Sequence, residues 1–346
     1  MEINYADGLR HLYVPSLNKV SSITKKGFRD WLRESSAYRI MDNISNDTFS
    51  ISCYDYAEAV EHVAYDINRL SCAALETIFN TKESSVNRKS LGWTLIQVYY
   101  SAFFSAHSLL KILGYGLIQI DGHTIDQIKQ REAVFGVNVN LSSGVYCSFF
   151  DERGSRVLFK KVSAYDDSHK GLWRRFTDIL DVLQNKKYSL NNNDPFLLIQ
   201  NTTGAIYRES VYKQLQQTDA IKMAEYISKL QERLRERDNY SWLSTTRNLI
   251  NYSHQFGIWY PYSAFLKEYE KIDTLRKLFP LDPFDKNFYV DNEMSLLKYM
   301  RTCQLVNSVN FEILQDLRAR HPENKSFLEK GVFAFHNLYS AKNLVS

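Results

Sequence analysis

The segment Trp93-Thr-Leu-Ile-Gln-Val-Tyr-Tyr-Ser-Ala-Phe-Phe-Ser-Ala-His-Ser-Leu-Leu-Lys-Ile-Leu113 decides the fold, because as a helix it is apolar around well over half of its circumference. The rest of its surface consists of small or uncharged residues: Thr94, Gln97, Ser101, Ser105 and Ser108. We therefore expect a central helix that is packed on several sides and ends at Gly114. His107 within this helix is interpreted as a hydrogen-bonded core histidine rather than a catalytic one.

Helical patterns lie on both sides of this segment. Apolar residues recur at steps of three and four over residues 54–81, and Gly27-Phe-Arg-Asp-Trp-Leu-Arg33 has the pattern of a short amphipathic helix. Further helices are predicted over the ranges 169–183, 210–237, 242–256, 264–278, 292–320 and 326–339. The chain contains only 13 Gly and 6 Pro in 346 residues, which agrees with long helices.

Two parts of the chain alternate like strands. One is Thr48-Phe-Ser-Ile-Ser-Cys53, and the other consists of residues 137–141, 145–150 and 156–160 with a turn at 151–154. We interpret the second part, about 137–162, as a small β-hairpin or three-stranded insertion. The predicted fold class is therefore mostly α, a helical bundle with a small β-hairpin insertion. We divide the chain into a mixed N-terminal segment (1–54), a helical core with the β insertion (55–261) and a C-terminal helical extension (262–346).

Composition and charge restrict the class of protein. The formal net charge of +4 permits nucleic acid as a partner, but a DNA-coating protein would be far more positive. The four cysteines have no C-x-x-C spacing, and the phosphate-loop and Gly-x-Ser-x-Gly motifs are absent, which disfavours a zinc site, an NTPase and a serine hydrolase of that type. Without a signal segment or an apolar run of about 18 residues, we expect a cytoplasmic protein with no membrane contact.

The segment Trp242-Leu-Ser-Thr-Thr-Arg-Asn-Leu-Ile-Asn-Tyr-Ser-His-Gln-Phe-Gly257 carries the clearest indication of chemistry. In a helix, Arg247, Asn251 and His254 would share one narrow face, with Asn248 at its edge. An arginine that keeps its charge would then lie two turns from a histidine that can transfer protons near neutral pH. Such a pair can act on a phosphodiester without a metal.

The arrangement Arg-Asn-x5-His resembles the signature of HEPN ribonucleases over about ten residues, and the expected helical core resembles that family more loosely. The resemblance implies a homodimer in which two motif helices form a composite cleft and cleave RNA with no metal or cofactor. His254 would act as general base or acid for attack by the ribose 2′-hydroxyl. Arg247 would stabilise the phosphate, and Asn248 would orient His254 or the phosphate. The family also suggests a toxin or antiviral defence effector with a regulatory protein partner.

Positive charge gathers in two places that could follow an RNA backbone. One includes Lys170, Arg174 and Arg175, with Trp173 or Tyr165 available to stack on a base, and the other covers residues 233–237. Together with Asn251, we take Lys170, Arg174 and Arg175 as candidate RNA contacts. Both runs also contain acids, so solvated helix faces explain them as well.

An alternative interpretation assigns no catalytic role to this segment. One Arg, two Asn and one His on a solvent-exposed helix face are common, and a HEPN-like scaffold can also be degenerate. The protein would then be a non-catalytic, all-helical adaptor, such as a partner or antitoxin-like subunit of a larger assembly. A DNA-binding regulator has less support, because no helix-turn-helix with a basic recognition helix is evident.

Overall fold

The structure is a computed structural model that describes residues 4–10, 13–22, 24–45, 47–86, 91–151, 155–162, 168–183, 217–235, 240–253, 256, 258–259 and 295–342. In these ranges ten α-helices account for 64% of the residues, and a five-stranded antiparallel sheet accounts for 14%. The prediction of a mostly α bundle with a small hairpin is therefore wrong. The fold is mixed, with a complete sheet beside the helices.

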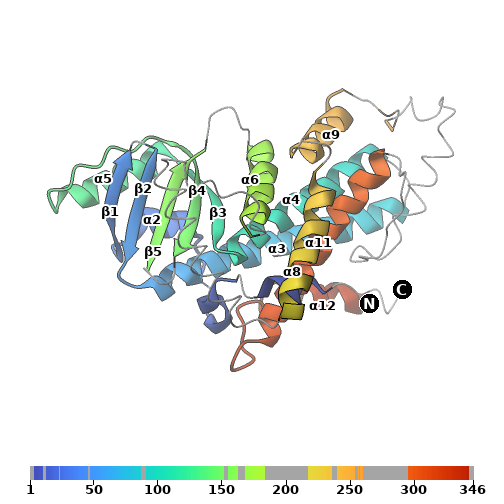
Figure 1. Cartoon of the computed structure of the whole chain (residues 1–346), viewed down its shortest axis with the longest axis horizontal. Helices are drawn as coiled ribbons and strands as arrows, with labels where there is room; N and C mark the ends of the chain where they lie inside the picture. The colour runs from blue at the N-terminus through green and yellow to red at the C-terminus, as the bar shows by residue number, and fades with distance from the viewer. Residues whose placement is uncertain are drawn as a thin grey trace.

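The sheet lies at one end of the molecule, on the left of Figure 1. Its strands are β1 (Tyr38–Ser45), β2 (Thr48–Cys53), β3 (Tyr115–Ile120), β4 (Gly144–Asp151) and β5 (Arg156–Lys161), and the described strands follow the order β1-β2-β5-β4-β3. The predicted hairpin is β4–β5, and the predicted strand at 48–53 is β2. Residues 137–141 are not a strand.

The hairpin does not stand alone because both of its outer edges are paired. Phe49 of β2 lies opposite Phe159 of β5, and Leu117 of β3 lies opposite Cys147 of β4. One face of the sheet packs on α2 (Phe28–Glu34), where the Phe28 ring contacts Phe159 with a centroid distance of 6.3 Å. A two-stranded hairpin is marginal in water, so the extra strands and this helix supply the burial that it needs.

The segment at 93–113 forms α4 (Leu91–Ile112), and its predicted central position is confirmed. It packs against α3 (Tyr56–Val86), α6 (Ser168–Leu183), α9 (Trp242–Asn251) and α11 (Ser295–Ala319). Its small polar stripe forms buried hydrogen bonds, for example from Ser105 Oγ to Asn307 Oδ1 at 2.9 Å. Gly114 follows the helix with a φ of +83°, which ends α4 as predicted and turns the chain into β3.

The remaining described elements complete the helical half: α1 (Tyr5–Leu9), the 3-10 helix η2 (Pro15–Lys19), α5 (Gly122–Ala133), α8 (Gln217–Leu234) and α12 (Val332–Lys342). The helices predicted over 210–237, 292–320 and 326–339 correspond to α8, α11 and α12, with later starts. The helix predicted over 264–278 lies outside the described residues. Every described helix is too short or too polar to cross a bilayer.

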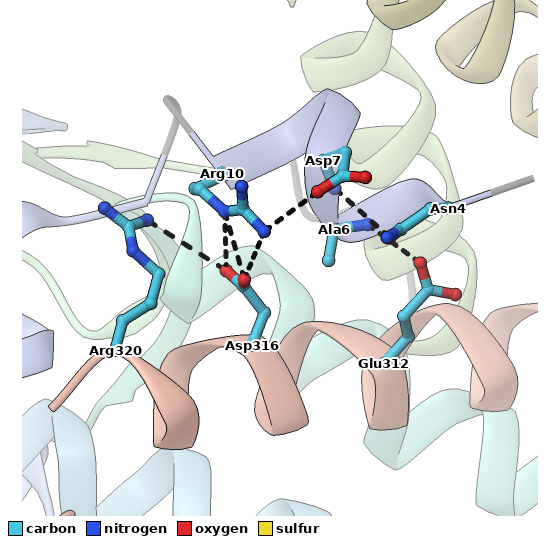
Figure 2. A network of polar contacts seen from close by, with 7 residues as sticks. All are labelled: Asn4, Ala6, Asp7, Arg10, Glu312, Asp316 and Arg320. Atoms are coloured by element: carbon cyan, nitrogen blue, oxygen red, sulfur yellow. Dashed lines mark hydrogen bonds and ion pairs between the residues drawn. The ribbon is translucent and has the colours of Figure 1, made fainter. Parts of the chain in front are cut away.

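A polar network joins the two ends of the chain (Figure 2). Arg10 Nε of α1 donates to both carboxylate oxygens of Asp316 in α11, at 3.0 and 3.1 Å. The backbone amide of Ala6 donates to Glu312 Oε1 at 3.0 Å, and Arg320 lies 4.0 Å from Asp316. These contacts fix the N-terminal helix to α11, which itself packs on α4.

Candidate functional site

The helix that carries the Arg–His motif is shorter than predicted. α9 ends at Asn251, followed by a turn at Tyr252 and a bend at Ser253. The prediction of one helix over 242–256 is therefore wrong, because the helix ends at Asn251. His254 itself lies outside the described residues.

The end of α9 is held by a tryptophan from the following segment. Trp259 Nε1 donates to the carbonyl of Ile250 at 2.7 Å, in the last turn of the helix. The Trp259 ring reaches this position by lying directly over Gly92 of α4, where a Cβ atom would come within 2.5 Å of the ring. Phe256, which lies between the end of α9 and Trp259, has a left-handed backbone with φ 72° and so changes the direction of the chain.

Arg247 points into the packed helices and not into solvent. The residue is 5% exposed, and its guanidinium carbon lies 5.4 Å from the ring centre of Tyr99 and 5.6 Å from that of Tyr100. Its Nη1 donates to Asn248 Oδ1 at 2.7 Å, and its buried Nε finds no hydrogen-bond partner among the described residues. Figure 1 shows α9 at the end of α4 that is remote from the sheet.

The positive charge of Arg247 is not neutralised by the described residues. No carboxylate of the described chain lies within ion-pair distance of the guanidinium, whose hydrogen bond goes to the neutral amide of Asn248. Burial raises the pKa of Tyr99 and of Tyr299, so the neighbouring phenols stay neutral. A buried charge is normally paired, and an unpaired arginine is therefore a candidate binding group for an anion.

A histidine from α6 lies against the same two tyrosines. The ring centre of His169 is 5.7 Å from Tyr99 and 5.7 Å from Tyr100, and its Nδ1 is 3.0 Å from the Tyr99 hydroxyl. We call the cluster of Tyr99, Tyr100, His169, Arg247 and Asn248 the Arg247 site. Sequence analysis missed the two tyrosines and His169, because only the packing of α4 and α6 against α9 brings them to Arg247.

The candidate RNA contacts are distributed over two helices of this site. On α6, Arg174 is exposed while Lys170 and Arg175 are half-buried, and on α9 Asn251 is half-buried. α6 and α9 contact each other, so these side chains belong to neighbouring elements.

The proposed base-stacking role of Trp173 is wrong. Trp173 is 1% exposed, and its Nε1 donates to the Tyr99 hydroxyl at 3.0 Å, so this ring supports the site from inside. The other stacking candidate, Tyr165, lies outside the described residues.

Within the described ranges, no group of three or more His, Cys, Asp or Glu side chains is arranged to hold a metal ion. Comparison of the chain with protein-family models, with curated proteins and with solved structures gives no match.

Proposed function

We propose that the protein is a metal-independent endoribonuclease in which Arg247 binds the phosphate that is cleaved. The observation that supports this proposal is a buried guanidinium with no carboxylate partner in the described chain, which lies beside two tyrosine rings. A planar fork of N–H donors fits a phosphate with two parallel hydrogen bonds, and such charge-assisted bonds are strong. Arg174 and Lys170 on the neighbouring helix would bind adjacent phosphates.

The proposed reaction needs only one acid–base group and one cation. His254 accepts the proton of the ribose 2′-hydroxyl, whose oxygen attacks the adjacent phosphorus. The bond from phosphorus to the 5′-oxygen breaks, and that oxygen takes up the proton that His254 has accepted. The products carry a 2′,3′-cyclic phosphate and a 5′-hydroxyl. Arg247 stabilises the negative charge that develops on the phosphate oxygens.

Asn248 has a more specific role in this proposal than the sequence suggested. Its Oδ1 accepts the hydrogen bond from Arg247 Nη1, so Asn248 orients the guanidinium in addition to its expected role towards His254 or the phosphate. We further propose that the protein acts in the cytoplasm as a homodimer, where two Arg247 sites meet in a composite cleft. A role as a toxin or antiviral effector that is controlled by a protein partner completes the proposal.

The test is an RNA cleavage assay in EDTA with the full chain. We expect new RNA ends with cyclic phosphate, detected by their resistance to a 3′-end ligase until the cyclic phosphate is removed. Loss of a general base or of a transition-state donor typically costs about 10²–10³ in rate. We expect His254→Ala and Arg247→Ala to lose activity on this scale, while Arg320→Ala, at an exposed arginine directly after α11, keeps it.

Two further measurements distinguish the alternatives. His169→Gln should retain most of the activity; if it abolishes cleavage while His254→Ala does not, the assignment of the acid–base group is wrong. The mass in solution, from light scattering, should be that of a dimer. Intact RNA under all conditions together with a monomeric mass would support the non-catalytic adaptor.

A further inference from the structure

A second feature of the molecule is a cavity of about 520 Å³ between α2, α3, α4 and β3. This volume is within the usual range of small-molecule sites. Phe103 separates the cavity from the Arg247 site, because its ring lines the cavity and also lies 4.4 Å from the ring centre of His169. We call this feature the α3–α4 cavity.

The lining of the α3–α4 cavity has an excess of positive charge. Four cations face it, Lys25, Arg29, Arg69 and Lys111, against the two carboxylates of Asp30 and Asp66. Asp30 is already bonded at 3.0 Å to Arg33, which does not line the cavity. Neither Lys25 nor Arg29 has a carboxylate within ion-pair distance in the described part of the chain. The cavity is therefore suited to an anion.

The floor of the cavity is a fixed ion pair. Asp66 lies 3.1 Å from Lys111 Nζ and 3.4 Å from Arg69, and it accepts a hydrogen bond from the Phe28 amide at 3.3 Å. Burial favours the neutral form of Asp66, but the charge and hydrogen bond of Lys111, the charge of Arg69 and the Phe28 amide together outweigh burial and lower the pKa of this carboxyl. A Cβ on Gly27 would lie 2.5 Å from Asp66 Oδ1, so Gly27 is needed for this close approach. Asp66 thus neutralises Lys111, and the cations at the opening remain for a ligand.

The remaining wall of the cavity consists of aromatic rings and a histidine. Tyr65, Phe103 and Phe104 line it together with His107, whose imidazole forms no hydrogen bond with the described residues. The expectation that His107 is a hydrogen-bonded core histidine stays a prediction, since the described residues supply no such bond. Burial, with nearby Lys111, lowers the pKa of His107 to about 3, so the ring is neutral and can donate one hydrogen bond and accept another.

We propose that the α3–α4 cavity binds a nucleoside monophosphate. The cations at the opening match its phosphate, the aromatic rings match its base, and the neutral His107 can bond to a polar group of the base or sugar. Inorganic phosphate alone would leave the aromatic wall unfilled. This inference does not depend on the proposed RNA cleavage, because it rests on a separate set of residues.

The test is calorimetric titration of the full chain with AMP, GMP, CMP and UMP. Inorganic phosphate and adenosine serve as probes that carry only the phosphate or only the nucleoside. We expect at least one nucleotide to bind about tenfold more tightly than either probe. The double variant Lys25→Ala/Arg29→Ala should weaken that affinity by about tenfold or more, since each lost charged contact is worth about that factor. The matched control is Lys325→Ala/Lys330→Ala, two exposed lysines away from the cavity.

Two more variants test where the base of the ligand binds and whether the cavity is independent of the Arg247 site. Phe104→Leu should weaken nucleotide binding by about tenfold and leave phosphate binding unchanged, because only the base stacks on this ring. Arg247→Met should change neither affinity, which separates the cavity from the Arg247 site. Nucleotides that bind no better than phosphate, or equal losses for the control pair and the cavity pair, would overturn the proposal.

Discussion

At the scale of the residue, Arg247 is kept at a cost to the free protein. A buried charge without an ion-pair partner destabilises the folded state by several kcal/mol before compensation. The described neighbours offset this only in part, through the Asn248 amide and two tyrosine rings at 5.4 and 5.6 Å. A residue whose charge is unfavourable in the free protein is best explained by an anion that binds to it.

This explanation predicts how Arg247→Met changes stability. Methionine has a similar length and no charge, so the free energy of unfolding should stay the same or rise by about 1–3 kcal/mol. Urea denaturation in a buffer without phosphate or sulfate measures this free energy of unfolding. Added phosphate should then stabilise the natural protein and not the variant. A loss of more than about 2 kcal/mol would show that Arg247 serves packing, and Lys330→Met gives the background of an exposed cation.

At the scale of the element, the end of α9 depends on a contact with a distant helix. Trp259 bonds to the Ile250 carbonyl only because Gly92 of α4 leaves room for its ring. Gly92 therefore supports the contact by which Trp259 bonds to the last turn of α9.

Gly92→Ala is expected to destabilise the protein by about 1–3 kcal/mol, because the new methyl group overlaps the Trp259 ring. It should also reduce RNA cleavage, if the proposed function is correct. The matched control is Gly122→Ala in the first turn of α5, where no atom lies within 4 Å of the added Cβ, and a change of stability near zero or slightly positive is expected. Thermal unfolding of the two variants makes the comparison, and equal melting temperatures would contradict it.

Elements with a strong local pattern could be predicted from the sequence, and those defined by distant partners could not. The all-round apolar run of α4 and the alternation in β4 and β5 are visible within the segments themselves. In contrast, β1 mixes polar and apolar residues and depends on β2, which in turn pairs with β5 from far along the chain. The spacing of the motif identified Arg247, but its contact with Tyr99 and His169 arises only from helix packing.

At the scale of the whole molecule, α3 and α4 connect the two halves. Both helices reach from the sheet to the helical end in Figure 1, and the α3–α4 cavity and the Arg247 site lie on either side of Phe103 of α4. The helical end is closed by α1, which contacts both α8 and α11. The ends of the chain thus take part in holding the helices that carry the site.

The coupling free energy of the Arg10–Asp316 pair measures how much the attachment of α1 to α11 contributes to the stability of the fold. The Asp316 carboxylate is 10% exposed and accepts three hydrogen bonds from the Arg10 guanidinium (Figure 2). We therefore expect a coupling free energy of about 1–3 kcal/mol from a double-mutant cycle with Arg10→Met and Asp316→Leu. The comparison pair is Lys325–Glu323, at 3.4 Å with side chains 72% and 69% exposed, which should couple by less than about 0.5 kcal/mol. Urea denaturation of the four proteins of each cycle provides both values. Equal coupling in the two cycles would mean that the N-terminal helix adds no more than a surface contact, whereas the expected difference would show that α1 is part of the cooperative fold.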